Sequence, residues 1–261
     1  MDIHIVMVMH TIGKEPYELV RALAGDDTTF HVFLHSHEPE ALDAFNRLPE
    51  VSQHLRLNHV GFNRGLAYSW NQGLVDAMDE GADTLFIAND DAEVNRTDML
   101  RMAEAAHDVG HEYYMINAQG LHVQGNLYAG LQLALAAVTP LWIEKIGAFD
   151  ENFLFCYHED VDLYKRAILQ GLQTYSIGDT SMRHLGSMTI RSSQRALHQL
   201  QTAVPRNEIY YAEKWGGPNG HEPFDRPFNN SAYGLKIPFE NRHCPYPDHQ
   251  RTDLDELLAI E

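Results

Sequence analysis

Hydrophobic and polar residues alternate in blocks along the first third of the chain, and the spacing within each block predicts its secondary structure. Short apolar runs rich in β-branched residues predict strands, and apolar residues at helical spacing predict helices. Strands and helices that follow each other in turn predict a doubly wound α/β layer with right-handed crossovers. The expected strands cover residues 3–9, 30–34, 55–60 and 84–88, and the expected helices cover residues 15–23, 39–48 and 66–78.

The later part of the chain is less regular. Residues 127–143 are strongly apolar, but Gln132 and Pro140 interrupt them and the stretch is short for a membrane span, so we expect buried core and no transmembrane segment. We expect a helix from Glu159 to a stop at Gly171, followed by a short strand at residues 173–177.

The pattern weakens after residue 195. Pro, Gly, Asn and His become frequent between Gly216 and His249, which predicts an irregular C-terminal extension. We therefore expect residues 1–195 to form the domain that binds ligand and carries the chemistry. Residues 196–261 are expected to form an extension on the acceptor side of that domain.

Charge narrows the choice of partners more than composition does. The chain has 261 residues, of which 44% are hydrophobic, as in an ordinary globular protein. Its 19 Lys and Arg residues oppose 37 Asp and Glu residues, which gives a formal net charge of −18. Such a field repels phosphate backbones, so nucleic acid is a poor partner. A nucleotide diphosphate would need a cation to bridge it to carboxylates.

Cysteine content and the N-terminus bear on the compartment. Cys156 and Cys244 are too few for a disulfide framework. Alternating apolar residues follow Asp2 in place of a basic region and a long apolar core, which differs from a signal peptide. Both features favour a reducing cytoplasm.

Two acidic segments are candidates for chemistry. Asn89-Asp90-Asp91 comes directly after the apolar run 84–88, where hard oxygen ligands suit Mg²⁺ or Mn²⁺, although Asn-Asp pairs are also common in turns. Glu159 and Asp160 stand where a helix begins, and they can face a cleft or simply cap that helix. Asp162 and Arg166 have the spacing of an exposed ion pair on the same helix.

Two further segments offer ligands for a metal and for an anion. His184 follows the strand at residues 173–177, and an imidazole beside carboxylates would complete a mixed nitrogen and oxygen shell. Asn63 and Gly65 precede the helix that carries Asn71, where a helix N-terminus favours a diphosphate. The alternatives are that His184 has a structural role and that Asn63 caps the helix.

In this order the segments resemble the GT-A type glycosyltransferases of family 2, particularly the rhamnosyltransferase-like branch. The resemblance covers roughly residues 3–217 and implies a GT-A fold, which is a Rossmann-like, doubly wound mixed sheet. The segments that carry it are Asn63-x-Gly65-x-Ala67-x-x-x-Asn71, Asn89-Asp90-Asp91, residues 146–151, Glu159-Asp160-Val161-Asp162-Leu163 with Arg166 and Gly171, His184, and Lys214-Trp215-Gly216.

The resemblance implies an inverting transfer of a sugar from a nucleotide-diphosphate donor to an acceptor hydroxyl. Asp160 corresponds to the catalytic base and Glu159 to its neighbour, while Asp91 and His184 correspond to ligands of Mn²⁺ or Mg²⁺. The acceptor would be a glycan, a lipid-linked molecule or a protein. The positions implied to contact the donor are Thr11, Asn63, Gly65, Asn71, Asn89 and Asp90.

The sequence also departs from the family. The second strand ends in Leu34-His35, whereas much of the family has an Asp there that recognises the nucleobase. A sugar-phosphate nucleotidyltransferase is one alternative, but residues 10–14 lack its glycine-rich basic loop. A binding protein without turnover is another. Tyr210, Tyr211 and Trp215 could stack on sugars, but we expect them to pack in the core.

Overall fold

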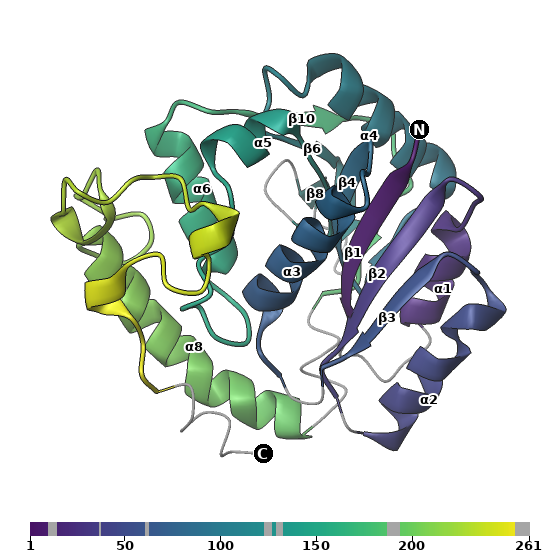
Figure 1. Cartoon of the computed structure of the whole chain (residues 1–261), viewed down its shortest axis with the longest axis horizontal. Helices are drawn as coiled ribbons and strands as arrows, with labels where there is room; N and C mark the ends of the chain where they lie inside the picture. The colour runs from purple at the N-terminus through teal and green to yellow at the C-terminus, as the bar shows by residue number, and fades with distance from the viewer. Residues whose placement is uncertain are drawn as a thin grey trace.

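The computed structural model describes residues 1–9, 15–36, 38–60, 63–122, 127–128, 133–186 and 194–253. Its centre is a seven-stranded sheet in the order β10-β6-β9-β4-β1-β2-β3 (Figure 1). Only β9 runs antiparallel to its neighbours among these described strands, so the sheet is mixed, as expected. The strands are β1 (Ile3–Met9), β2 (Thr28–Leu34), β3 (Leu55–His59), β4 (Thr84–Asn89), β6 (Met115–Ala118), β9 (Leu135–Val138) and β10 (Thr174–Ile177).

Helices cover both faces of this sheet. Alternate side chains of β1 point to opposite faces, so that Ile5 and Met7 join one apolar core while Val6 and Val8 join the other. The first core is completed by α1 (Glu15–Leu23), α2 (Pro39–Arg47) and α4 (Arg96–Val109), and the second by α3 (Leu66–Asp79), α5 (Pro140–Lys145) and α6 (Glu159–Leu169). The predicted doubly wound layer is therefore confirmed, and the apolar run 135–138 is buried within it.

A second, smaller sheet extends the molecule beyond the carboxyl end of β4. Its strands are β5 (Ala92–Glu93), β11 (Arg183–His184), β7 (Gly120–His122) and β8 (Leu127–Tyr128), in that order. Each has two or three residues, which is too short to leave a periodic signal in the sequence. Because β5 pairs with β11, this sheet carries His184 to the end of β4.

The C-terminal segment differs in part from the prediction. It opens with a regular helix, α8 (Gln194–Trp215), which the weakened pattern did not reveal because polar residues and Pro205 interrupt its apolar positions. From Gly216 to Asp253 the chain is irregular, as expected, with short turns η2 (Pro227–Asn229), η3 (Phe239–Asn241) and η4 (Pro247–His249). A further short turn, η1 (Leu48–Glu50), continues α2.

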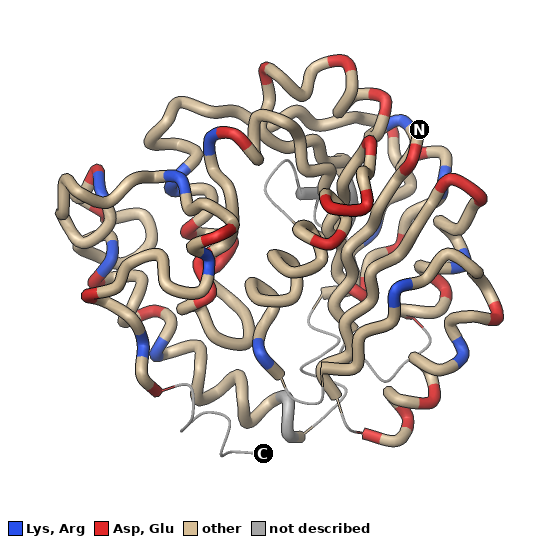
Figure 2. Tube along the Cα trace, in the orientation of Figure 1, with Lys and Arg blue, Asp and Glu red and all other residues tan. Residues whose placement is uncertain are grey.

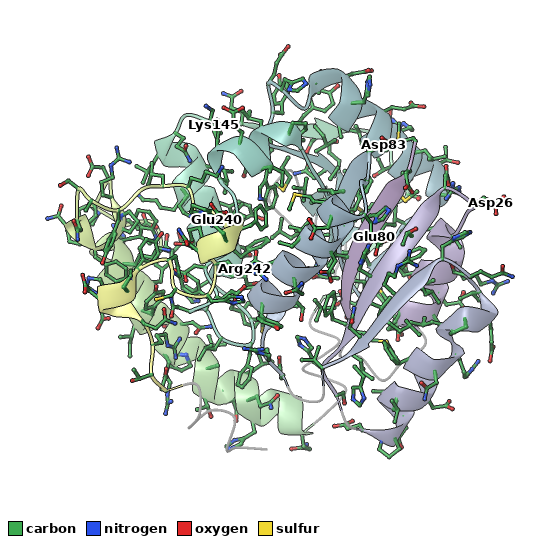
Figure 3. All side chains as sticks on the ribbon, in the orientation of Figure 1. Asp26, Glu80, Asp83, Lys145, Glu240 and Arg242 are labelled. Atoms are coloured by element: carbon green, nitrogen blue, oxygen red, sulfur yellow. The ribbon has the colours of Figure 1, made fainter. Side chains whose placement is uncertain are left out.

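The irregular segment returns to the core of the sheet domain. Arg242 lies over α3 (Figure 3), where its guanidinium donates to Gln72 at 2.8 Å. Ile237 pairs with Gly147 and packs with Ala148 and Tyr246. Acidic positions are distributed over both halves of the described trace (Figure 2). None of the described helices combines the length and the apolar character that a bilayer crossing needs.

Candidate active site

Asp91 and His184 meet at the junction of the two sheets. Asp90 and Asp91 form the tight turn between β4 and β5, and pairing of β5 with β11 places His184 opposite Ala92. The Nε2 atom of His184 lies 3.1 Å from a carboxylate oxygen of Asp91. The backbone supports this arrangement, because the Leu185 amide donates to the Asp91 carbonyl at 3.2 Å.

This pair fits a divalent ion whose coordination shell is completed by oxygen atoms of the substrate. Magnesium is commonly held by one or two carboxylates together with phosphate oxygens and water, and an imidazole suits manganese as well. Asp90, the residue before Asp91, is also buried. Glu93, a further oxygen ligand in principle, instead lies 3.2 Å from Arg183, and both of these side chains are half exposed.

Glu159 and Asp160 are the first residues of α6. The backbone before them is left-handed at three residues that are not glycine, with φ of 62° at Phe155, 70° at Tyr157 and 77° at His158. Left-handed backbone costs about 1–2 kcal/mol for each such residue and persists only where the surroundings enforce it. Strain of this kind gathers at functional sites, which supports the assignment of this segment to one.

Burial raises the pKa of both acidic groups. Glu159 is 4% exposed, and its pKa lies well above the ordinary value because of desolvation and the nearby charge of Asp160. Desolvation also raises the pKa of Asp160, although the Val161 amide, 2.8 Å away, opposes the change. Among the described residues, the Oε2 atom of Glu159 has no hydrogen-bond partner. The carboxyl groups of Glu159 and Asp160 can therefore hold a proton more readily than exposed carboxyl groups.

The loop before α3 packs directly on the strained segment. The Oδ1 atom of Asn63 accepts a hydrogen bond from the Gly65 amide at 2.9 Å. Gly65 has φ of 95°, and a Cβ atom there would lie 2.7 Å from the Phe155 nitrogen. The Leu66 amide then donates to the Phe155 carbonyl at 2.7 Å. This contact brings the Asn63 loop next to the chain that leads into Glu159 and Asp160.

Asn71 binds the turn at residues 146–151. Its side chain is fully buried, donates to the Phe149 carbonyl at 3.0 Å and accepts from the Phe149 amide at 2.8 Å. It also donates to Glu151 at 3.0 Å. These contacts give Asn71 a structural role, and a contact with a donor stays a prediction.

The pair formed by Asp162 and Arg166 is present but is not exposed, which corrects the expectation from helical spacing. Their side chains are 2.9 Å apart and both are 0% exposed. The reason is Lys214, which reaches from α8 and places its Nζ 2.6 Å from Asp162 and 2.8 Å from Asp150. Burial acts to raise the pKa of Asp150, but the Lys214 ammonium holds that pKa below its ordinary value.

The aromatic residues of α8 pack in the core, as predicted. Tyr210, Tyr211 and Trp215 are 4%, 1% and 0% exposed. The Trp215 indole nitrogen donates to Asp162 at 3.0 Å, and the Tyr210 hydroxyl donates to Asp150 at 2.9 Å. Both bonds end on the same buried carboxylates that Lys214 joins.

His35 takes the place where an Asp is common in the family. It is buried, and its ring nitrogens lie 3.1 Å from the Asn63 Oδ1 atom and 2.7 Å from the Ser69 hydroxyl. The imidazole therefore supports the loop before α3. Thr11, which was expected to contact the nucleotide, lies outside the described residues.

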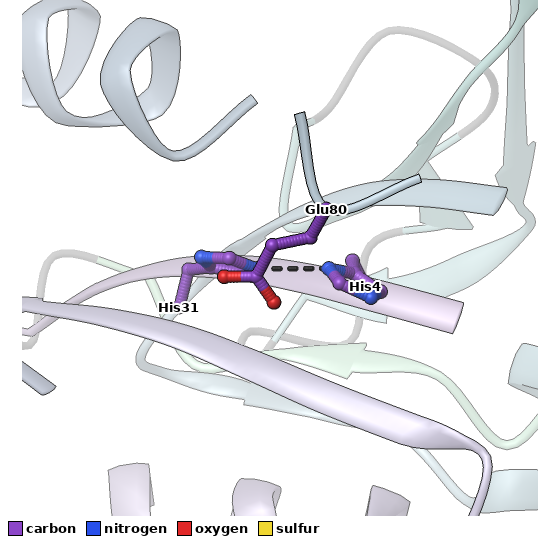
Figure 4. Close-up of side chains that lie close together, drawn as sticks. All are labelled: His4, His31 and Glu80. Carbon is purple, nitrogen blue, oxygen red and sulfur yellow. Dashed lines mark hydrogen bonds between the residues drawn. The ribbon is translucent and has the colours of Figure 1, made fainter. Parts of the chain in front are cut away.

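A separate cluster of His4, His31 and Glu80 lies at the opposite end of β1 (Figure 4). The facing nitrogens of the two histidines are 2.9 Å apart and the ring centroids 5.1 Å apart, so the rings meet almost end to end. A hydrogen bond between these two nitrogens accounts for the contact. Arg56 also holds Glu80 at 2.9 Å. We therefore interpret the cluster as a hydrogen-bonded pair.

The contacts group the expected residues into two sets. Asp91 and His184 form one, and the loop of Asn63 and Gly65 joins the segment leading to Glu159 and Asp160 in the other. The described contacts do not link Asp160 to Asp91 directly. Asp91 and the Asn63 loop follow the carboxyl ends of the parallel strands β4 and β3, where ligands gather in open α/β sheets. The segment that leads to Glu159 and Asp160 reaches the same edge by its contact with the Asn63 loop.

No protein-family model matches the chain, and no curated protein matches its sequence. Solved structures do match. S. aureus TarS is 12% identical with a TM-score of 0.56, over 81% of this chain and 43% of that chain. TarS 1–349 in complex with UDP is 14% identical with a TM-score of 0.56, over 82% of this chain and 70% of that chain.

These likenesses show that the chain has the GT-A glycosyltransferase fold. The chain spans less than half the length of the whole TarS chain that it matches. The fold agrees with the expectation drawn from the sequence.

Proposed function

We propose that the protein is an inverting, metal-assisted glycosyltransferase that uses a nucleotide-diphosphate-sugar donor. The observation that carries the proposal is the contact between Asp91 and His184 at 3.1 Å, at the carboxyl end of a central strand in a GT-A fold. TarS, which shares this fold, has been crystallised with UDP. The family 2 and rhamnosyltransferase-like assignment is part of this proposal and rests on the order of motifs in the sequence.

Asp91 and His184 would hold Mn²⁺ or Mg²⁺. When bound, such an ion supplies positive charge to the diphosphate of the donor and stabilises it as a leaving group. Both side chains are mostly buried, at 7% and 15% exposure, so that few waters compete for the same positions. Asn89 and Asp90 flank the ion site from the end of β4.

Asp160 would act as the general base. It would take the proton of the acceptor hydroxyl while that oxygen attacks the anomeric carbon from the side opposite the diphosphate, and the bond to the diphosphate would break. The raised pKa of Asp160 makes it a stronger base than an exposed carboxylate. Glu159, more deeply buried, would carry the proton of the pair and leave Asp160 ionised.

The donor would lie against the loop before α3. Asn63 and Gly65 lie directly before the N-terminus of α3, where a diphosphate is favoured. Thr11 and Asn71 complete the proposed donor contacts. Residues 1–195 would form the nucleotide-sugar-binding and catalytic domain, and residues 196–261 the acceptor side, with a glycan, a lipid-linked molecule or a protein as acceptor. A cytoplasmic location belongs to the same proposal.

A panel of nucleotide sugars with and without Mn²⁺ tests the function. We expect one donor to raise the melting temperature only with metal present, because a ligand that binds the native state stabilises it by mass action. The same donor should release nucleoside diphosphate slowly. Formation of a nucleoside triphosphate and a sugar 1-phosphate from that donor when pyrophosphate is added would instead indicate a nucleotidyltransferase, and stabilisation without any turnover would indicate a binding protein.

A further inference from the structure

One amide side chain on α8 gathers the strained segment before Glu159. Asn207 is 0% exposed. Its Nδ2 atom donates to the carbonyls of Leu154 at 2.9 Å, Cys156 at 3.1 Å and Tyr157 at 3.1 Å, and its Oδ1 atom accepts from the Leu154 amide at 3.2 Å. Three carbonyls can converge on one amide only if the backbone between them winds tightly.

The winding is the left-handed conformation described above. Phe155 lies between two residues whose carbonyls Asn207 binds, and Tyr157 is itself the third such residue. Both have positive φ, and so does His158, which follows directly. Glycine would adopt these angles at little cost, but none of the three residues is glycine. The contacts with Asn207 therefore offset conformational strain that the local sequence does not relieve.

The same face of α8 also binds the chain on the C-terminal side of Glu159 and Asp160. Asn207 and Lys214 are seven positions apart, which places them on one face of a helix. Lys214 binds Asp162 at 2.6 Å, two residues after Asp160. The chain from Leu154 to Asp162 is thus bound to α8 at both ends, with Glu159 and Asp160 between the two points of attachment.

Arg251 extends the arrangement into the C-terminal segment. Its guanidinium donates to the Asn207 Oδ1 atom at 2.6 Å and to the Asn152 carbonyl at 3.1 Å. Every donor and acceptor position of the Asn207 amide is therefore in use. Asp would lack the two N–H donors and Ala would lack the whole group, so the contacts require an amide.

We propose that Asn207 is a positioning residue that sets the orientation of Asp160 through the segment 154–158. The inference rests on the proposed function of Asp160. Asn207 touches no reacting atom, and its effect passes through the backbone that enters α6. The sequence contains no signal for this role, since a single Asn within a helix has no motif around it.

Asn207→Ala and Asn207→Asp test the inference, with Tyr211→Phe as the control. Tyr211 lies on the same helix and its hydroxyl donates to Glu222 at 2.7 Å, so Tyr211→Phe removes a partly buried hydrogen bond from α8 but none from residues 154–158. Asn207→Asp keeps the acceptor bonds to Leu154 and Arg251 and loses the donors, which gives a second variant should Asn207→Ala fail to fold.

The kinetic readout is kcat per folded molecule, with the folded fraction taken from circular dichroism. A displacement of about 1 Å in a reacting group can cost about 10²-fold in rate, so we expect kcat of both Asn207 variants to fall by that order while the donor KM stays near wild type. Tyr211→Phe should keep its kcat. Wild-type kcat in a folded Asn207 variant, or an equal loss in Tyr211→Phe, overturns the inference.

A second readout needs no turnover. The carboxyl ¹³C titration of Glu159 should show a raised midpoint in the wild type that moves toward the ordinary Glu value in Asn207→Ala and Asn207→Asp, because the loosened segment admits water. An unchanged midpoint overturns the inference even in an active enzyme. Inactivity of the wild type on every donor would instead remove the proposed function, while the titration would still report on the contact.

Discussion

The Nε2 atom of His184 lies 3.1 Å from a carboxylate oxygen of Asp91. His184 belongs to β11 of the small sheet, whereas Asp91 lies in the turn after β4 of the seven-stranded sheet. The contact depends on the pairing of β5 with β11, two strands of two residues each. The candidate metal site is therefore held by the smallest regular element of the fold.

Removal of the imidazole should weaken the metal site. In His184→Ala we expect the Mn²⁺ concentration for half-maximal activity to rise by about 10- to 100-fold, because the ion loses one ligand and Asp91 loses its neighbour. His107→Ala, which removes an exposed imidazole, is the control. A titration of activity against Mn²⁺ decides the matter, and equal curves for the two variants would exclude His184 from the shell.

Removal of the proposed base should slow sugar transfer and leave donor binding intact. In Asp160→Asn we expect the transfer rate to fall by about 10²- to 10⁴-fold, since the amide cannot take the acceptor proton. Donor binding, measured by calorimetry with Mn²⁺, should be unchanged. Asp225→Asn removes an exposed carboxylate from the C-terminal segment and should keep full activity. Transfer at the wild-type rate in Asp160→Asn would take the base role from this residue.

The loop before α3 should not tolerate a side chain at Gly65. In Gly65→Ala the left-handed backbone costs about 1–2 kcal/mol, and the new Cβ also collides with the Phe155 nitrogen at a separation of 2.7 Å. Gly81→Ala is a matched control, because Gly81 has φ of 84° with nothing within 4 Å of a Cβ atom. Urea unfolding should show the larger loss for Gly65→Ala, and equal losses would mean that the collision is relieved elsewhere.

The buried lysine should contribute strongly to stability. Lys214→Met leaves Asp150 and Asp162 buried without their shared cation, and removal of one partner from such a group costs about 3–5 kcal/mol. Lys145→Met removes an exposed lysine that pairs with Glu144, and it should leave the urea midpoint close to wild type. A similar midpoint for both variants would show that the buried carboxylates find other partners.

Acid should destabilise the protein through the histidine pair at the start of the sheet. Burial lowers the pKa of His31 from 6.5 to about 4, and His4 adds to the effect. A folded pKa below the unfolded one means that the unfolded state binds the proton more readily, so stability falls as the pH drops from about 6.5 toward 4. The charged groups that face His31 are His4, Glu80, Asp76 and Arg56.

Urea unfolding across this pH range measures the effect. We expect the wild type to lose about 1–3 kcal/mol of unfolding free energy between pH 6.5 and pH 4 through this group. In His31→Gln the slope against pH should be smaller, whereas His107→Gln, an exposed histidine, should keep the wild-type slope. Equal slopes in all three proteins would assign the acid sensitivity to other groups.

The sequence predicted the sheet better than it predicted the site. The apolar run that became β4 has a strong local signal, and its burial follows from a mixed sheet covered on both faces. The i,i+4 spacing of Asp162 and Arg166 correctly indicated an ion pair. It could not indicate burial, because burial depends on Lys214 arriving from a helix far along the chain.

Other features left no local signal at all. The left-handed backbone at Phe155, Tyr157 and His158 involves no glycine and is imposed by Asn207 across the fold. The small sheet consists of strands too short for a period to be seen, so the meeting of Asp91 and His184 was expected from the family resemblance and not from spacing. Contacts of this kind depend on tertiary structure, and the secondary-structure propensities of single residues do not indicate them.

The ammonium of Lys214 has a consequence for protein engineering. Since it neutralises one carboxylate from the turn before α6 and another from α6 itself, residues 196–261 cannot be exchanged between proteins of this fold as an independent module. A chimera joined at residue 195 would need a cationic side chain at the position of Lys214 on the helix that replaces α8. Without one, Asp150 would be a buried carboxylate with no cation beside it, and Asp162 would keep only Arg166.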